Sequence, residues 1–162
     1  MTKDVAAQTS DFSFASEGYD ASKYEAVARS ARLREVRLVN SAYSAKVMSF
    51  MAAEVGDGMD LKQSYSGAPS EHSFVPERGI VAGSYIWTAE VKAGRTKAMK
   101  LSAEYMVVYS GLKGAPEEYV SLYFKKLARF TTYPYFRAHF AVQVAASCLM
   151  LAPLPSLTDR VD

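Results

Sequence analysis

The sequence predicts an α+β fold with an antiparallel sheet. Apolar and polar residues alternate over residues 81–91 and 99–109, and the glycine turn at 93–95 separates these two segments, which is the pattern of a β-hairpin. Two segments with the apolar spacing of helices follow between residues 116 and 149. A run of strands followed by a run of helices is typical of the α+β class.

The first helical segment, residues 116–130, begins with a proline and two acidic residues. Pro116 suits the first turn of a helix, where the N–H that proline lacks has no intrahelical partner. Glu117 and Glu118 follow, and their charges complement the positive end of the helix dipole. Large apolar side chains then occupy more than one face, so a single neighbouring layer should cover only part of them. They are Tyr119, Val120, Leu122, Tyr123, Phe124, Leu127 and Phe130.

A second helix is predicted over residues 135–149, after a corner at residues 131–134. Pro134 can start a helix but interrupts the one that precedes it, and the threonines before it offer capping hydroxyls. The only polar side chains from Tyr135 to Leu149 are Arg137, His139, Gln143 and Ser147. A helix that is apolar nearly all round is buried on most sides. Its run of about 15 residues is shorter than the roughly 20 that cross a membrane, so we expect a core helix.

The N-terminal third should contain a flexible segment, a short helix and a long strand. Residues 1–20 are rich in small, polar and acidic side chains, which predicts flexibility. Asp20 is a good N-cap for an additional helix over residues 21–32. From residue 33 the apolar alternation changes phase near Leu38–Asn40, which indicates a strand with a bulge or bend there.

The next part of the chain is expected to hold a short strand between two irregular segments. Residues 48–58 end in Gly-Asp-Gly, which is a turn signal. Alternation over residues 59–65 predicts a short strand, and the sequence SGAPSE at 66–71 predicts a loop. The domain should then run from residue 21 to residue 157, with residues 158–162 as a charged tail.

Length, charge and cysteine content exclude several classes of protein. A chain of 162 residues fits a single domain. The formal net charge of +2 is too small, and the basic residues too scattered, to predict nucleic-acid binding. The single cysteine, Cys148, lies among apolar residues and is interpreted as a packed thiol in a cytoplasmic protein. The N-terminus has no apolar segment of the signal-peptide kind, and we expect no membrane insertion.

The sequence offers little reactive chemistry. It contains no nucleophile elbow, Walker loop or dinucleotide fingerprint. His72 and His139 lack metal-ligand spacing, and a lone histidine on an apolar helix is more often a hydrogen-bonded core residue than a base. We therefore expect no catalytic residues, no cofactor and no metal, and we regard an enzyme as the least supported class.

Aromatic residues are what the chain has in excess: 11 tyrosines, 8 phenylalanines and one tryptophan. Trp87, Phe136 and Phe140 are interpreted as core. Aromatic residues on both sides of helix 116–130 exceed what one sheet can cover, so the remainder should pack on another copy of the chain or line a groove. One alternative is an oligomeric protein that binds hydrophobic small ligands in the same aromatic cavity.

The C-terminal residues resemble those of the SecB export chaperones. The resemblance rests on Pro134-Tyr135-Phe136-Arg137 at a helix start and on Leu151-Ala152-Pro153 after that helix, and it covers roughly residues 33–157. Four strands and a helix before the Pro-Tyr corner follow the order of elements in that family. The resemblance implies a four-stranded antiparallel sheet with its C-terminal helices packed on one side, in a tetramer built as a dimer of dimers.

The resemblance also implies a function, which is that of an ATP-independent cytosolic holdase for unfolded, pre-export polypeptides. In the family the apolar grooves lie between the helices and the sheet, which assigns substrate contact to Tyr119, Tyr123, Phe124, Phe130, Tyr133 and Tyr135. Tyr85, Trp87 and Tyr105 are further candidates for the groove wall, and Arg137 is interpreted as a structural anchor.

Two partners of such a chaperone are considered. Members of the family that deliver clients to the motor SecA are acidic and have a longer C-terminal tail, whereas this chain has a net charge of +2 and stops soon after Leu157. SecB-like proteins that instead guard the antitoxin of a toxin–antitoxin system diverge in the same way. SecA and an antitoxin are therefore both retained as candidate partners beside unfolded polypeptides.

Overall fold

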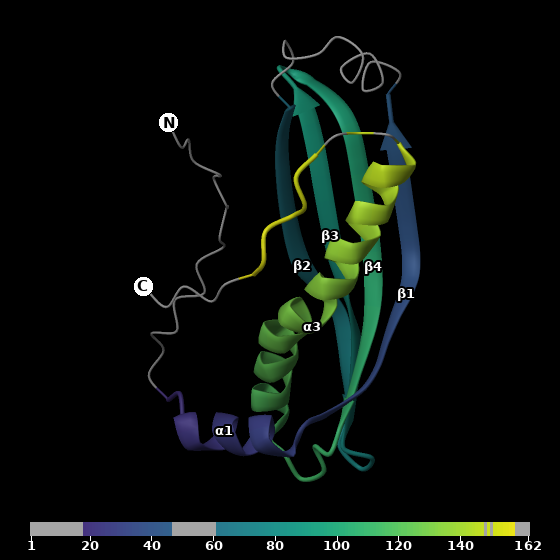
Figure 1. The fold of residues 1–162 in the computed structure, drawn as a ribbon. Coiled ribbons are helices and arrows are strands. Elements are labelled where there is room, and N and C mark those ends of the chain that lie inside the picture. The colour runs from purple at the N-terminus through teal and green to yellow at the C-terminus, as the bar shows by residue number, and fades with distance from the viewer. Residues whose placement is uncertain (1–17, 47–60, 148, 150, 158–162) are drawn as a thin grey trace.

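The computed structural model describes residues 18–46, 61–147, 149 and 151–157. One antiparallel sheet of four strands, in the order β1-β4-β3-β2, is covered on one face by the long helix α3 (Figure 1). The strands are β1 (Arg32–Ala45), β2 (Leu61–Val75), β3 (Ile80–Ala93) and β4 (Thr96–Ser110). The predicted α+β class, with its four-stranded antiparallel sheet and C-terminal helix on one side, is confirmed.

The hairpin β3–β4 forms as its alternation predicts. Val91 pairs with Met99 and Ala93 with Thr96, and a register shift after Val91 accommodates one extra residue of β4. Gly94, in the turn, has a φ of +60°, which a glycine adopts without steric cost. The residues of β3 and β4 that alternate with the lysines and serines point toward α3 and are buried.

The bulge predicted near Leu38–Asn40 is confirmed, because the register of β1 against β4 shifts between these two residues. A second shift, between Leu33 and Glu35, was not expected. β1 is an edge strand of the sheet, and both irregularities therefore bend an edge.

The loop predicted over residues 66–71 is wrong, because these residues lie inside the 15-residue strand β2. Gly67 faces Trp87 across the ladder, and the register shifts between Pro69 and His72. β2 is the other edge strand, where a proline without an N–H is tolerated. Turn-forming residues therefore mark an irregular edge in this strand and do not end it. The remaining expectations for residues 1–17, 47–60 and 158–162 lie outside the described residues.

The predicted break before Pro134 is also wrong, since α3 (Glu117–Ala146) is one helix of 30 residues with Pro134 inside it. Pro134 removes the N–H that would bond the carbonyl of Phe130, and the helix axis changes direction midway (Figure 1). Phe124 and Phe136 are fully buried on either side of this point. Packing of both halves on the same sheet thus outweighs the local cost of the proline.

The predicted additional helix is present as α1 (Ala21–Ser30), and its cap is the predicted one. The Asp20 carboxylate accepts a hydrogen bond from the Ser22 N–H at 3.0 Å. The hydrogen bond lowers the pKa of this carboxyl. α1 packs against the start of α3, where Val27 is 2% exposed and the rings of Tyr24 and Tyr123 lie 6.3 Å apart. α1 therefore covers the end of α3 that the sheet leaves open.

Candidate functional site

The structure places most of the predicted groove residues in the core of the single chain. Seven of them are less than a tenth exposed: Tyr85, Trp87, Tyr105, Tyr119, Tyr123, Phe124 and Tyr133. Phe130 is half-buried, and Tyr135 is 52% exposed. Their contact with a client stays a prediction, and in one isolated chain Tyr135 is the member best placed to make it.

Trp87 lies at the centre of the aromatic core, and the prediction that it is a core residue is confirmed. Its ring lies 5.0 Å from that of Tyr133 and is stacked at 5.7 Å on that of Phe136, both from α3. Its Nε1 donates to the hydroxyl of Thr132 at 2.8 Å, and that hydroxyl donates to the Ala128 carbonyl at 2.7 Å. Aromatic rings from sheet and helix thus pack on one another.

Burial also determines the protonation state of three tyrosines in this core. It raises the pKa of Tyr105 and of Tyr109 to about 12, and it raises the pKa of Tyr133 further above the ordinary value. These phenols therefore remain neutral over the whole physiological range. Tyr133 uses its hydroxyl to donate to the backbone carbonyl of Pro155.

An exposed apolar strip, formed by Leu38, Tyr135 and Val142, lies beside the contact between α3 and β1. Leu38 pairs with Tyr105 in the ladder, and the Tyr105 ring lies 6.4 Å from that of Tyr135. Leu38 is 44% exposed and Val142 63%. Sequence reasoning missed Leu38 and Val142, although the switch of alternation in β1 already placed apolar residues on both of its faces.

The strip continues along the outer side of α3 as a stripe of small apolar residues. Ala138, Ala141, Ala145 and Ala146 are all exposed, and none of them adds a polar group to that face. Residues at these spacings share one side of a helix. An alanine-rich helix face allows close approach of another backbone. The expectation that this helix is buried on most sides is wrong for this face.

Residues 151–157 form an extended segment that lies beside α3 on the same face of the sheet (Figure 1). Leu149 and Leu154 are buried, and the Leu154 carbonyl accepts a hydrogen bond from Arg137 Nε at 2.6 Å. Arg137 thus holds the C-terminal segment against α3, which is the kind of contact that a structural anchor makes.

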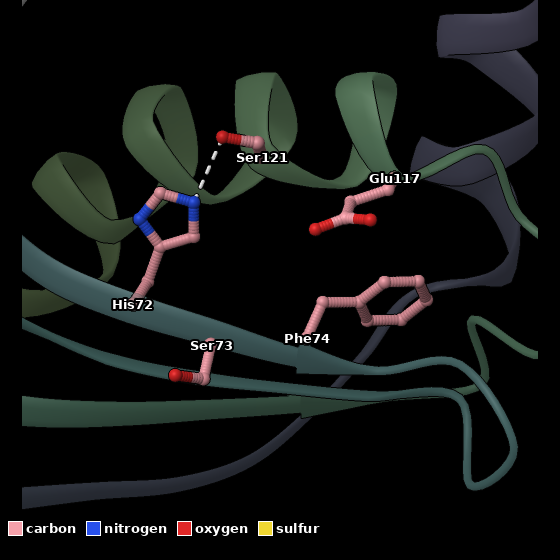
Figure 2. Close-up of a pocket in the computed structure, with 5 residues that line it drawn as sticks. All are labelled: His72, Ser73, Phe74, Glu117 and Ser121. Carbon is pink, nitrogen blue, oxygen red and sulfur yellow. Dashed lines mark hydrogen bonds between the residues drawn. The ribbon is translucent and has the colours of Figure 1, made fainter.

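A pocket of about 270 Å³ between β2 and the start of α3 is lined by His72, Ser73, Phe74, Glu117 and Ser121 (Figure 2). The Nε2 atom of His72 and the Ser121 hydroxyl lie 2.8 Å apart, and the His72 ring is stacked on Phe124. Figure 2 shows that the second ring nitrogen points away from Glu117, so these groups are not arranged as a nucleophile, a base and an orienting acid. The hydrogen bond joins β2 to α3.

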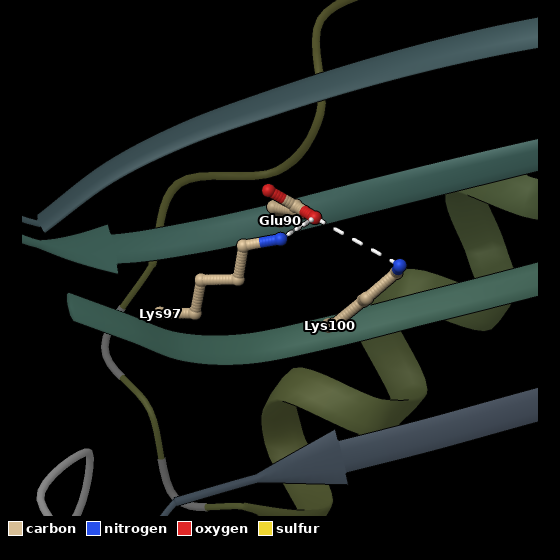
Figure 3. Close-up of polar contacts among 3 residues, drawn as sticks. All are labelled: Glu90, Lys97 and Lys100. Carbon is tan, nitrogen blue, oxygen red and sulfur yellow. Dashed lines mark hydrogen bonds and ion pairs between the residues drawn. The ribbon is translucent and has the colours of Figure 1, made fainter. Parts of the chain in front are cut away.

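The face of the sheet opposite α3 carries charges at the β3–β4 turn. Lys97 Nζ lies 2.7 Å and Lys100 Nζ 3.9 Å from the same oxygen of Glu90 (Figure 3). The hydrogen bond from Lys97, with the nearby lysine charges, lowers the pKa of Glu90. Lys92, directly opposite Lys97 in the ladder, adds a further positive charge. This part of the sheet is therefore basic.

Within the described residues, no group of histidine, cysteine, aspartate and glutamate side chains has the arrangement of a metal site. No described helix is both long enough and apolar enough to span a bilayer.

Comparisons with known proteins identify the fold. No protein-family model and no curated protein matches the chain. Among solved structures, the Rv1957 SecB-like chaperone of Mycobacterium tuberculosis, in complex with a ChAD peptide from the HigA1 antitoxin, matches with a TM-score of 0.68 and 16% identity, over 86% of this chain and 99% of that one. A protein of unknown function from Streptococcus agalactiae matches at a TM-score of 0.30 and 10% identity, over 79% of this chain and 96% of that one, which is too low to support an argument. The chain therefore has the fold of the SecB-like chaperones.

Proposed function

We propose that this protein is a cytoplasmic, ATP-independent holdase chaperone that binds unfolded polypeptides, including pre-export chains, in an apolar groove between α3 and the sheet. The observation that carries the proposal is the exposed strip of Leu38, Tyr135 and Val142 beside a core that is already filled. An exposed apolar surface of this kind marks an interaction site. The SecB-like fold supports the same function.

Self-association should cover part of that surface. The apolar stripe on the outer side of α3 has no covering element among the described residues, and a helix face of this composition suits packing against a second copy. We therefore propose a homotetramer, built as a dimer of dimers, in which α3 faces α3 through this stripe and the neighbouring Val142, while Leu38 and Tyr135 next to β1 remain for the client.

The predicted groove residues take two roles in this proposal. Tyr135 and Phe130 contact the client directly, because they are the least buried of the set. The buried residues Tyr85, Trp87, Tyr105, Tyr119, Tyr123, Phe124 and Tyr133 form the rigid wall behind them. A groove of this sort binds one extended peptide weakly, and several grooves on one oligomer raise the avidity by about 10²–10⁴.

The decisive experiment is suppression of aggregation of a reduced, unfolded protein without nucleotide. We expect suppression at an equimolar ratio of tetramer to client, and failure at several-fold excess would exclude the proposal. The double variant Leu38→Ser, Tyr135→Ser should weaken client binding because each side chain loses apolar contact area. Val75→Ser is the matched control, since Val75 is 42% exposed on the opposite face of the sheet.

The second candidate function is that of a chaperone for an antitoxin. It is favoured by one observation, namely that the solved SecB-like chaperone matched above holds an antitoxin peptide. A pull-down followed by mass spectrometry separates the candidates, because a general holdase returns many unfolded precursors, with SecA if it delivers them. A dedicated antitoxin chaperone returns one small protein in stoichiometric amount.

A further inference from the structure

The extended C-terminal segment, residues 151–157, is held in a way that a foreign peptide could copy. Its burial repeats every three residues: Leu154 is fully buried, Leu151 and Leu157 are half-buried, and the four residues between these leucines are exposed. Three residues per turn is the period of a polyproline II helix, a conformation without internal hydrogen bonds. Pro153 and Pro155 are compatible with it and lack the N–H groups that a sheet ladder needs.

The protein holds this segment through its main chain. Arg137 Nε donates to the carbonyl of Leu154 at 2.6 Å, and the Tyr133 hydroxyl donates to the carbonyl of Pro155. Tyr133 and Arg137 lie one turn apart on α3 and thus face the segment together. Every residue of every polypeptide has such a carbonyl, so these contacts do not depend on the sequence of the bound segment.

The remaining contacts come from an apolar surface. Leu151 and Leu157 pack against the core cluster that contains Trp87 and Tyr133. The ring of Tyr65, from β2, lies 5.5 Å from the Tyr133 ring. The segment is joined to α3 by side-chain donors and is not a strand of the sheet. It can therefore leave without breaking a ladder of backbone hydrogen bonds.

We infer that the surface beneath residues 151–157, beside Tyr133 and Arg137, is a polypeptide-binding site. Residues 151–157 occupy this site in cis, and an unfolded client enters it by displacing them. The inference rests on the proposed holdase function and adds a ligand class to it: extended segments with a large apolar residue at every third position. The tethered segment competes at a high effective concentration, which lowers the apparent affinity for clients and rejects those with few apolar residues.

Energy transfer within the full chain tests the displacement. Trp87 is the only tryptophan of the sequence, and an AEDANS label on Ser156→Cys, in a Cys148→Ser background, places the acceptor on an exposed residue of the segment. The client is reduced and alkylated pancreatic trypsin inhibitor, which has no tryptophan, and anisotropy of a fluorescein label on it reports binding independently. We expect energy transfer to fall as the client saturates the protein. The same label on Ser66→Cys, in the sheet, is the control and should show no loss.

The two proposals fail in different ways. If anisotropy shows no binding of the client, the holdase function itself is overturned, and this inference with it. If the client binds while energy transfer stays constant or rises, the segment remains in place or closes over the client, and the inference alone is overturned.

Variants of the segment give a second, independent measurement. Leu154→Ser should release the segment and raise the affinity for the client by about threefold or more, since a larger fraction of the sites is open. Ala152→Ser, which introduces the same serine at an exposed position of the segment, is the control and should leave the affinity unchanged. If Leu154→Ser fails to fold, Tyr133→Phe replaces it as the test. This variant removes one carbonyl contact to the segment, keeps the ring, and should lower the energy transfer from Trp87 to the label at position 156. Unchanged or weaker client binding by a folded Leu154→Ser protein would contradict the inference.

Discussion

Thr132 connects the core tryptophan to the helix that covers it. Its hydroxyl accepts from Trp87 Nε1 at 2.8 Å and is fully buried. Thr132→Val keeps the shape of the side chain but leaves the indole N–H without that acceptor, which should cost about 1–3 kcal/mol of unfolding free energy. Urea denaturation followed by Trp87 fluorescence measures the loss. Thr88→Val, on the open face of the sheet, is the control and should lie within about 0.5 kcal/mol of the parent.

His72 makes the stability depend on pH. Burial, and secondarily the charge of Lys125, lowers the pKa of this imidazole below its ordinary value of 6.5, and Glu117 opposes the shift. The folded protein therefore binds the proton less readily than the unfolded chain does. The resulting stability is present above pH 6.5 and is lost as the pH falls from 6.5 toward the lower folded pKa.

His72→Gln removes this ionisation, so its unfolding free energy should decrease less between pH 7 and pH 5 than that of the parent. Denaturant midpoints at a series of pH values provide the test. His139→Gln is the matched control, because it removes an imidazole that bonds Ser41 of β1 at 2.9 Å and leaves His72 in place. Parallel pH profiles for His72→Gln and the parent would show that His72 is not the titrating group.

At the level of elements, β2 requires a glycine at position 67, where the rings of Trp87 and Tyr85 lie close to its backbone. A Cβ on Gly67 would lie 2.5 Å from Trp87 Cε3 and 2.6 Å from Tyr85 Cε1, both of which are buried. Gly67→Ala should therefore lower the unfolding free energy by roughly 1–3 kcal/mol, because neither ring has room to move. Thermal unfolding of this variant and of Ser66→Ala, an exposed neighbour, gives the comparison. Equal melting temperatures would mean that the rings do move.

The same glycine shows why some elements were predictable from the sequence and others were not. The alternation of β3 and β4, the Asp20 cap and the bulge in β1 are local signals, and each was confirmed. Gly67 and Pro69 read locally as a loop, yet pairing with β3 keeps them in a strand. Pro134 reads locally as a helix end, yet packing on the sheet carries α3 through it. Tertiary contacts decide these cases, and a single sequence does not display them.

On the scale of the whole molecule, the sequence predicted the residue types of the candidate site better than their positions in the fold. The aromatic excess and the region around Tyr135 were visible in the sequence, and Tyr135 is indeed exposed beside the sheet. The side chain that faces the core at each position depends on the exact phase of α3, which the expected break at Pro134 obscured. Leu154 and its carbonyl contact with Arg137 could not be anticipated, because side chains of a distant helix hold that segment.

The outer stripe of α3 should decide the size of the assembly. Val142 is 63% exposed in the single chain, so a lysine there is solvated in a monomer but becomes a buried, unpaired charge if two copies of α3 pack together. Val142→Lys should therefore reduce the mass measured by light scattering from that of a tetramer to that of a smaller species. Its far-UV spectrum should stay unchanged. Val75→Lys, the same substitution on the opposite face of the sheet, should leave the mass unaltered.

Assembly and stability are linked, which gives the same variant a second readout. When folding is coupled to association, the melting temperature rises with protein concentration. The parent should show this rise, and Val142→Lys should show a smaller one. A parent chain that is monomeric at all concentrations, with a concentration-independent melting temperature, would leave the apolar stripe of α3 without a partner copy and would contradict the proposed tetramer.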